Sequence, residues 1–319
     1  MRTLTLSLIL AAAACIAQAA APGGPRARAA QPASRSCPAR TPTPTYYAPS
    51  QVDLLGLLSP PPAAGSAEQQ AELASLLALQ KSARADGSLE RAIADSEMSC
   101  ARFKDVLGAE LKSAAASKAL KFISAAAQSA AGASNPGKRY WKRARPFIVS
   151  PQVERFADVA VGGRMAWGEY PDEHCEEPPP TDEKEIAKAR AARDKAEYER
   201  DHTSYPSGHA AYGMACAVLL AEAIPEKRAE LFARGRLYGE SRVVVGAHFP
   251  SDVAAGQRSA LIGLTLVMQN ASFERQFASL QADLRRALGY PAEVPDLEPD
   301  KDLFKDKDAP AEAAARPRR

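Results

Sequence analysis

The sequence predicts an all-α protein, a compact helical bundle, and three observations lead to this fold class. Four leucines between residues 73 and 79 recur at helical spacing behind a capping-box pattern, Ser66-x-x-Gln69. Runs of β-branched residues are scarce, and strand-like alternation of apolar and polar residues is absent. Hydrophobic residues make up 46% of the 319 residues, which is enough for a proper core, so we expect one helical domain.

Turn-forming residues divide this domain into its expected elements. The apolar patch 54–58 ends at three prolines, and Asn135-Pro136-Gly137 is expected to break the chain. Val243-Val244-Val245 is too short to build a sheet. The expected helices cover residues 66–82, 89–97, 103–111, 117–131, 181–200, 210–220, 225–242, 251–268 and 273–288.

The N-terminus has the pattern of a secretion signal in residues 1–21. A positive start at Arg2 is followed by an apolar stretch and by a small-x-small cleavage site around Gln18. Behind it, no segment has the roughly 18 consecutive apolar residues of a membrane span. We therefore expect a soluble, periplasmic or secreted protein without integral membrane contact.

Composition marks the remaining boundaries. Residues 22–50 are rich in Ala, Pro, Arg and Thr and predict a flexible lead-in, whereas 51–290 is the expected folded domain. Within it, about 171–200 forms a polar helical insertion, either a solvated flap over the site or an inert surface addition. Residues 291–319 contain few apolar side chains and predict a disordered tail.

Removal of the signal would leave four cysteines, which allow three complete pairings in an exported chain. At least one disulfide is expected, but the sequence does not choose among the pairings. For Cys216, which lies on the expected buried helix after the turn at 206–208, the alternative interpretation is a reduced core cysteine. The four are Cys37, Cys100, Cys175 and Cys216.

The formal net charge of +3 is nearly neutral and does not indicate a nucleic-acid surface. One local feature stands out, a dense basic cluster with interleaved aromatics from 138 to 145. Its Lys138 and Arg145 are candidate anion ligands. Arg139, Lys142 and Arg143 are expected either to be solvated or to support the site from behind.

The segment 204–209, Ser-Tyr-Pro-Ser-Gly-His, is a short turn that opens into an apolar run. Ser207 is a good helix-starting residue. A turn feeding a helix points unpaired backbone N–H groups and the positive end of the helix dipole at one spot, which favours phosphate or another oxyanion. His209 lies at the same spot and can transfer a proton near neutral pH.

Downstream, Ser241-Arg242 is followed by His248 and, four positions later, by Asp252. On a helix or tight turn this spacing places the carboxylate and the imidazole on one side. A carboxylate that holds one ring nitrogen leaves the other free to attack, as in an activated nucleophile.

Together, Lys138-x6-Arg145-Pro146, Pro206-Ser207-Gly208-His209 and Ser241-Arg242-x5-His248-x3-Asp252 resemble one known pattern. It is that of the superfamily of type 2 phosphatidic acid phosphatases and vanadium haloperoxidases. Further similarity, in 57–62 and 204–205 for example, is to class A bacterial non-specific acid phosphatases.

The resemblance implies hydrolysis of small-molecule phosphate monoesters at acidic pH, with a broad substrate range and no metal or other cofactor. It implies that His248 is the nucleophile that forms a phosphohistidine, that Asp252 holds it and that His209 protonates the leaving oxygen. The residues expected to bind the phosphate are Lys138, Arg145, Ser207, Gly208 and Arg242. A homo-oligomer is compatible with the sequence.

Two positions depart from the class A pattern. Thr203 stands where glycine is usual and Ala210 where threonine is usual, which leaves substrate range and turn flexibility open. Three other functions compete: a vanadate-dependent haloperoxidase, a soluble lipid-phosphate or diphosphate phosphatase, and a non-catalytic phosphate-binding protein. The haloperoxidase would need vanadate as its cofactor.

Overall fold

A computed structural model describes residues 45–48, 51–108, 111, 113–156 and 201–295, with scattered residues between 182 and 198. Every regular element in these ranges is helical, which confirms the all-α fold class. The described residues lie in one unit, Ala39–Arg319. The expected signal peptide, most of the insertion and the C-terminal tail lie outside them.

The elements follow one another in a simple order, with short 3₁₀ turns labelled η. In chain order they are α1 (Leu54–Leu57), α2 (Ala67–Asp86), α3 (Ser88–Ala94), η2 (Cys100–Phe103), α4 (Lys104–Leu107), α5 (Ala114–Ala131), η4 (Gly132–Ser134), α6 (Asn135–Trp141), α7 (Pro146–Val149), α9 (Gly208–Ala223), η5 (Pro225–Lys227), α10 (Arg228–Val244), α11 (Pro250–Met268) and α12 (Ala271–Ala287).

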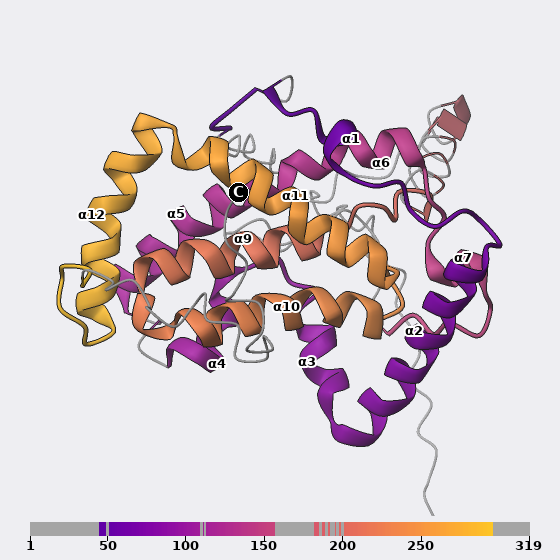
Figure 1. Cartoon of the computed structure of the whole chain (residues 1–319), viewed down its shortest axis with the longest axis horizontal. Coiled ribbons are helices and arrows are strands. Elements are labelled where there is room, and N and C mark those ends of the chain that lie inside the picture. The colour runs from indigo at the N-terminus through magenta and orange to yellow at the C-terminus, as the bar shows by residue number, and fades with distance from the viewer. Residues whose placement is uncertain are drawn as a thin grey trace, which may run out of the picture. The chain divides into compact units, whose positions relative to one another are not determined.

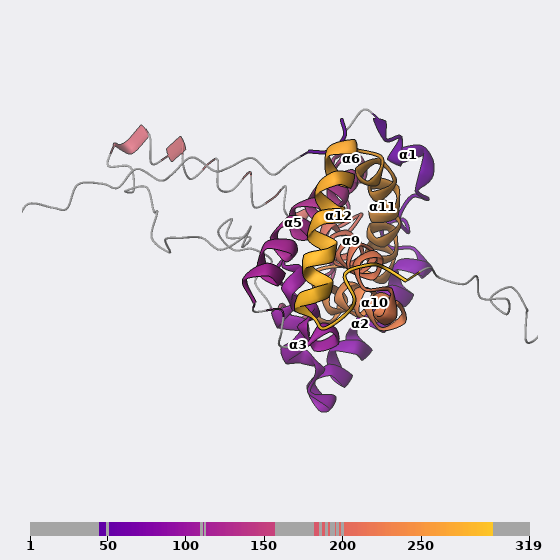
Figure 2. The ribbon, with the colours of Figure 1, turned by 90° about the vertical axis from the view of Figure 1, so that its left-hand side faces the viewer.

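Helix α9 is the central element, and α5, α10 and α11 pack around it (Figure 1). Twelve of its 16 residues are buried, on all sides of the helix, as expected for a helix that is apolar all round. In the turned view of Figure 2, α12 stands in front of α5 and α9, which it contacts. Because α9 begins at the predicted turn, the packing of three helices fixes the position of that turn.

Local capping accounts for several helix starts. The hydroxyl of Ser66 accepts a hydrogen bond from Gln69 N at 3.2 Å, as the capping pattern predicts. The Gln69 side chain accepts from Gly65 N rather than from Ser66 N, so only half of a capping box forms. Pro250 occupies the first turn of α11, where the missing N–H of proline has no cost.

Two sequence expectations about local structure are wrong. Asn135-Pro136-Gly137 does not break the chain but forms the first turn of α6, where proline is tolerated. The helix expected over 103–111 is replaced by η2 and the short α4, which has Gly108 as its C-cap residue. Gly108 has a φ of 93°, a conformation that favours glycine and stops a helix.

The interpretation of Cys216 as a reduced core cysteine is also wrong. Cys216 on α9 forms a disulfide with Cys100 at the start of η2. Both residues are fully buried. The bond therefore ties the segment that follows α3 to the central helix.

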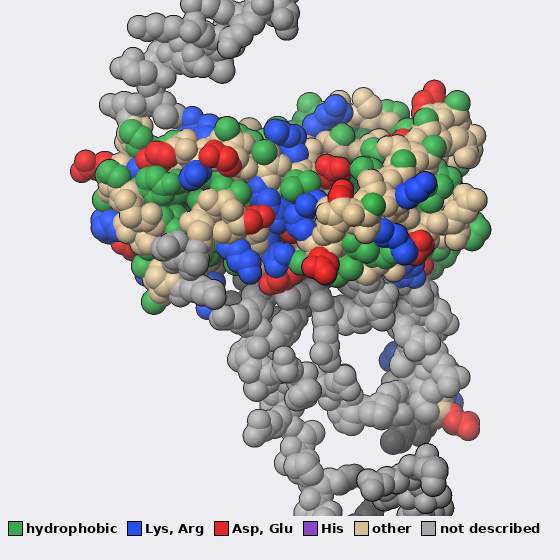
Figure 3. Space-filling view, turned by 90° about the horizontal axis from the view of Figure 1, so that it is seen from below, with side chains coloured by type: hydrophobic (Ala, Val, Ile, Leu, Met, Phe, Trp, Pro, Cys, Tyr) green, Lys and Arg blue, Asp and Glu red, His purple; other side chains and the backbone are tan. Residues whose placement is uncertain are grey.

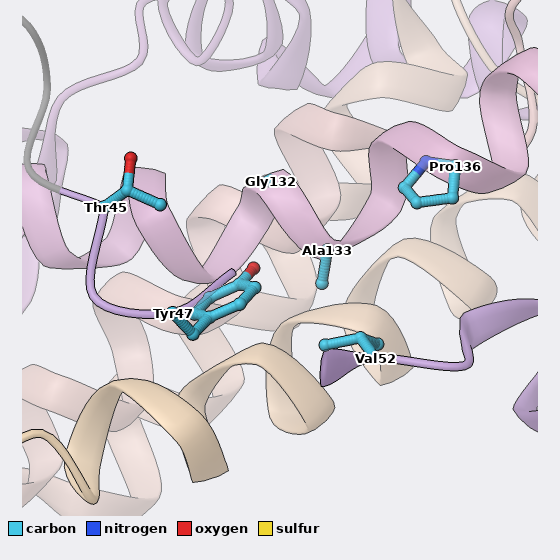
Figure 4. A pocket seen from close by; sticks show the side chains of 6 residues that line it. All are labelled: Thr45, Tyr47, Val52, Gly132, Ala133 and Pro136. Atoms are coloured by element: carbon cyan, nitrogen blue, oxygen red, sulfur yellow. The ribbon is translucent and has the colours of Figure 1, made fainter. Parts of the chain in front are cut away.

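Residues 45–48, within the stretch expected to be a flexible lead-in, pack against the helical core. Tyr47 donates its hydroxyl hydrogen to Ser129 O at 2.9 Å, and Tyr46 O accepts from Asn270 at 3.1 Å. Tyr47 and Val52 line a small pocket beside η4 and Pro136 (Figure 4). None of the predicted site residues lines this pocket.

Candidate active site

The turn before α9 is held in place by two hydrogen bonds of Ser207. Its hydroxyl accepts from Ala210 N at 3.3 Å, which makes Ser207 the N-cap residue as predicted. Its backbone N–H donates to Asp252 O at 2.8 Å, so α9 and α11 start side by side. The preceding Tyr205–Pro206 peptide bond is cis.

At the N-terminus of α9, two backbone N–H groups of the described structure remain available to a ligand. Ala210 N and Ala211 N are satisfied by the Ser207 hydroxyl and carbonyl. The N–H groups of Gly208 and His209 have no hydrogen-bond partner within the described part of the chain. These two donors and the helix dipole favour an anion at this position.

Lys138, on α6, lies over this turn. Its ammonium donates to Thr203 O at 2.8 Å, and a Cβ placed on Gly208 would lie 3.7 Å from Lys138 Cε. Burial, with a smaller effect of the nearby Arg145, lowers the pKa of Lys138 from 10.5 to about 7. A bound anion would oppose both effects and hold the lysine in its charged form.

Arg242, near the C-terminal end of α10, is 1% exposed. Its Nη1 donates to Ser96 Oγ at 2.6 Å, and its Nε is buried without a partner in the described residues. Burial lowers the pKa of Arg242 to about 10. Among the described residues, neither Arg242 nor Lys138 forms an ion pair with a carboxylate.

Arg145, the N-cap residue of α7, reaches the second predicted histidine. Its Nη1 lies 2.7 Å from Ala247 O and 3.1 Å from Nε2 of His248. Because a guanidinium can only donate, Nε2 is the accepting nitrogen, and the proton of the neutral ring is on Nδ1. Nε2 is therefore the nitrogen that carries the lone pair.

On the other side of the ring, His248 Nδ1 lies 3.4 Å from Ser204 Oγ and 3.6 Å from Asp252 Oδ2. The same carboxylate oxygen accepts from Ser204 Oγ at 2.6 Å and from Phe249 N at 2.8 Å. The expected pairing of His248 and Asp252 is thus a close approach of the two side chains, with the Ser204 hydroxyl placed between them. All three side chains are buried.

Both histidines are held neutral when the site contains no anion. Burial, and then Arg242 and His248, lower the pKa of His209 well below 6.5. Burial, and then Arg145 and Lys138, do the same to the pKa of His248. A neutral imidazole such as that of His248 can act as a nucleophile, and a bound anion would raise the lowered pKa of His209.

Arg143 supports the site from behind, one of the two roles left open for it, and it is not solvated. It is 6% exposed, and its Nη1 donates to Asp252 Oδ1 at 2.6 Å. Its Nη2 donates to Glu72 on α2 at 2.7 Å, and its guanidinium stacks 4.2 Å from the centre of the Phe249 ring. Arg139 and Lys142 are exposed.

The structure thus brings the predicted site residues together from α6, α7, α9, α10 and α11. Three residues of the site had no role in the sequence pattern. Ser96 contributes its hydroxyl and its carbonyl, Ser204 its hydroxyl and Thr203 its carbonyl. Ser204 belongs to the recognised segment 204–209, but no pattern in the sequence points to Ser96. The predicted residues that converge are Lys138, Arg145, Ser207, Gly208, His209, Arg242, His248 and Asp252.

The described residues contain no group of three or more His, Cys, Asp or Glu side chains with the geometry to hold a metal ion. None of the helices described is both long and apolar enough for a membrane crossing. On the face in Figure 3, basic side chains gather near the middle with acidic ones around and among them. This face therefore presents both signs of charge, in keeping with the small net charge.

Comparison with known proteins agrees with this geometry. The model of the family described as the PAP2 superfamily matches residues 118–275. That range contains the residues of all three sequence motifs.

The similar proteins are bacterial phosphatases. The chain is 41% identical over 85 residues to a non-specific acid phosphatase of Salmonella typhimurium, an alignment that covers 27% of this chain and 34% of that protein. It is 40% identical over 84 residues to an acid phosphatase of Zymomonas mobilis, covering 26% and 32%. The chain thus spans about a third of the length of these relatives.

Proposed function

We propose that this chain, whose residues 118–275 match the model of the PAP2 superfamily, hydrolyses phosphate monoesters to an alcohol and inorganic phosphate. One observation carries the proposal. Lys138 and Arg242 are cations without a carboxylate partner among the described residues, and they lie at a helix N-terminus beside two neutral histidines. A phosphoryl group supplies the negative charge that this arrangement lacks.

In the first step, the lone pair on His248 Nε2 attacks phosphorus while the bond to the ester oxygen breaks. Arg145, which now donates to Nε2, would turn to a phosphate oxygen and free that lone pair. The Nδ1 proton of His248 stays directed at Ser204 and Asp252, so the charge that develops on the ring is balanced. The product is a phosphohistidine.

His209 donates a proton to the departing oxygen, and the alcohol leaves. Water then attacks the phosphohistidine, gives a proton to His209, and breaks the phosphorus–nitrogen bond to release phosphate. Two in-line displacements leave the configuration at phosphorus unchanged. No metal takes part in this scheme.

The scheme favours an acidic pH optimum. His209 must be protonated and His248 neutral in the substrate complex, so activity is expected to be bell-shaped in pH. The negative charge of the substrate would raise the pKa of His209 from its low value in the empty site. The acidic limb reports protonation of the nucleophile, and the other limb reports loss of the acid proton.

The proposal also covers the substrates of the protein and its location in or outside the cell. The substrates are small-molecule phosphomonoesters of broad range, and the residues 1–21 direct the protein to the periplasm or out of the cell. A homo-oligomer is compatible with this function.

The test is release of p-nitrophenol from p-nitrophenyl phosphate between about pH 4 and 9 in excess EDTA. His248→Ala should lower turnover by roughly 10³-fold or more, and phosphate should still bind. His202→Ala is the matched control, because His202 bonds only to Tyr198 O in the described residues and lies outside the site. Full activity of His248→Ala would exclude it as nucleophile.

An inactive wild-type protein would overturn the proposal. Halide oxidation with added vanadate would then test the haloperoxidase alternative. Hydrolysis of a short-chain phosphatidic acid but not of p-nitrophenyl phosphate would favour the lipid-phosphate alternative.

A further inference from the structure

Ser96 contacts two of the site residues at once, although it lies far from every motif in the sequence. It follows α3, and its hydroxyl accepts from Arg242 Nη1 at 2.6 Å. Its backbone carbonyl lies 3.2 Å from His209 Nε2. Because a carbonyl only accepts, this contact requires the proton of the neutral ring to be on Nε2, and it leaves Nδ1 as the second nitrogen.

The residue before Ser96 is anchored to α10. Asp95 is fully buried, and both of its oxygens accept from Arg234, at 2.6 and 3.0 Å. Ser241, adjacent to Arg242, also donates to Asp95 at 2.8 Å. The helix that carries Arg242 therefore also holds the residue next to Ser96, whose hydroxyl Arg242 contacts.

The residues after Ser96 are anchored as well. The carbonyl of Glu97 accepts from the hydroxyl of Tyr238 on α10. Cys100 is bonded covalently to Cys216 on α9, the helix that carries His209. The segment 95–100 is thus fixed to both helices whose side chains Ser96 contacts.

We propose that Ser96 is a positioning residue: its hydroxyl directs Arg242 toward the phosphate, and its carbonyl orients His209 for proton transfer to the leaving oxygen. The inference rests on the proposed function. Since the two contacts use different groups of one residue, side-chain variants separate them.

Ser96→Ala removes the hydroxyl and keeps the carbonyl. The dissociation constant of inorganic phosphate, measured by calorimetry, should rise about tenfold, the effect of one lost hydrogen bond to a charged group. KM for p-nitrophenyl phosphate should rise in parallel, whereas the limb of the kcat profile that reports the acid should stay in place. Ser96→Thr keeps a hydroxyl and should restore most of the affinity.

Ser99→Ala is the matched control. The Ser99 hydroxyl accepts from Ala101 N in the same segment, and no contact with Arg242 is seen in the described residues. If Ser99→Ala weakens phosphate binding as much as Ser96→Ala, the effect is structural and the role of the hydroxyl is wrong. Unchanged phosphate affinity in Ser96→Ala also overturns it.

The carbonyl contact is tested by two-bond proton–nitrogen correlation spectra of the His209 ring in phosphate-free wild-type protein. We expect the ring proton to be on Nε2. A tautomer with the proton on Nδ1 would overturn the proposed role of the Ser96 carbonyl. Neither the calorimetry nor the spectra need turnover. Phosphate binding that depends on Ser96 in a protein without phosphatase activity would therefore refute the proposed function and keep only the role of the Ser96 hydroxyl in directing Arg242.

Discussion

The guanidinium of Arg143 and the carboxylate of Asp252 form a buried ion pair, with Nη1 2.6 Å from Oδ1. Arg143 occupies one oxygen of the carboxylate, and Ser204 and Phe249 N occupy the other. The oxygen that faces His248 is thus fixed in direction. In the proposed mechanism Asp252 would hold His248 in place, because Arg143 compensates the buried charge of the carboxylate.

Replacement of Arg143 by Met should therefore destabilise the protein by roughly 3–5 kcal/mol, because it leaves a buried carboxylate without its cation. Turnover should fall as well, since Asp252 and His248 lose their fixed orientation. Urea unfolding and kcat measure the two effects. Arg139→Met, a change at an exposed neighbour, is the control, and equal stability of both variants would contradict the role given to Arg143.

Anion affinity should depend on the charge of Lys138. Its pKa is lowered to about 7, so in the empty site the lysine loses its proton as the pH rises through that value. Inhibition by sulfate, whose own charge is constant in this range, should weaken above pH 7 by up to about tenfold per pH unit.

Lys138→Arg keeps the charge at all these pH values and should flatten the dependence above pH 7. A wild-type inhibition constant that stays level from pH 7 to 9 would contradict the lowered pKa.

The lowered pKa of Lys138 also makes stability depend on pH. Between about pH 7 and 10.5 the lysine of the unfolded chain, with its pKa of 10.5, binds more protons than the lysine of the folded protein. The contribution of Lys138 to the free energy of unfolding should therefore increase as the pH rises through this range.

Close packing of α11 on the turn requires a glycine at 256. A Cβ at this position would lie 2.1 Å from the carbonyl oxygen of Ser207. Gly256→Ala should therefore cost about 1–3 kcal/mol in stability and shift the turn, with a fall in turnover that urea unfolding and kinetics detect together.

Gly132→Ala provides the comparison. At Gly132 the nearest atom beyond the local chain would be the Tyr47 hydroxyl, 3.9 Å from the new Cβ. The φ of −56° suits alanine, so stability should be unchanged or slightly higher. If Gly256→Ala behaves in the same way, the close approach to Ser207 is not limiting.

The Cys100–Cys216 disulfide should contribute strongly to stability, because it closes a loop with a sequence separation of 116. Replacing both cysteines by serine should lower the free energy of unfolding by roughly 2–5 kcal/mol. Reductant should lower the stability of the wild type toward that of the variant and leave the variant unaffected. Wild-type stability that does not respond to complete reduction would argue against the bond.

Local sequence patterns predicted those parts of the fold that depend on local physics. The hydroxyl of Ser207 caps α9, and Pro250 starts α11, because capping and proline geometry involve neighbours in the chain. The same reasoning failed at Pro136. A proline between an asparagine and a glycine indicates a turn, but it also fits the first turn of a helix, and packing of Gly137 against Pro206 selects the helix here.

The sequence by itself determined the helical fold class, the starts of the central helices and the identity of the cationic and histidine side chains, since spacing and residue chemistry are properties of the chain. Tertiary structure decided which other groups contact and orient these side chains. The roles of Arg143 and Ser96 and the pairing of Cys100 with Cys216 depend on contacts between residues 109, 146 and 116 positions apart. No local pattern encodes such contacts, because they arise only when α3, α9, α10 and α11 pack together.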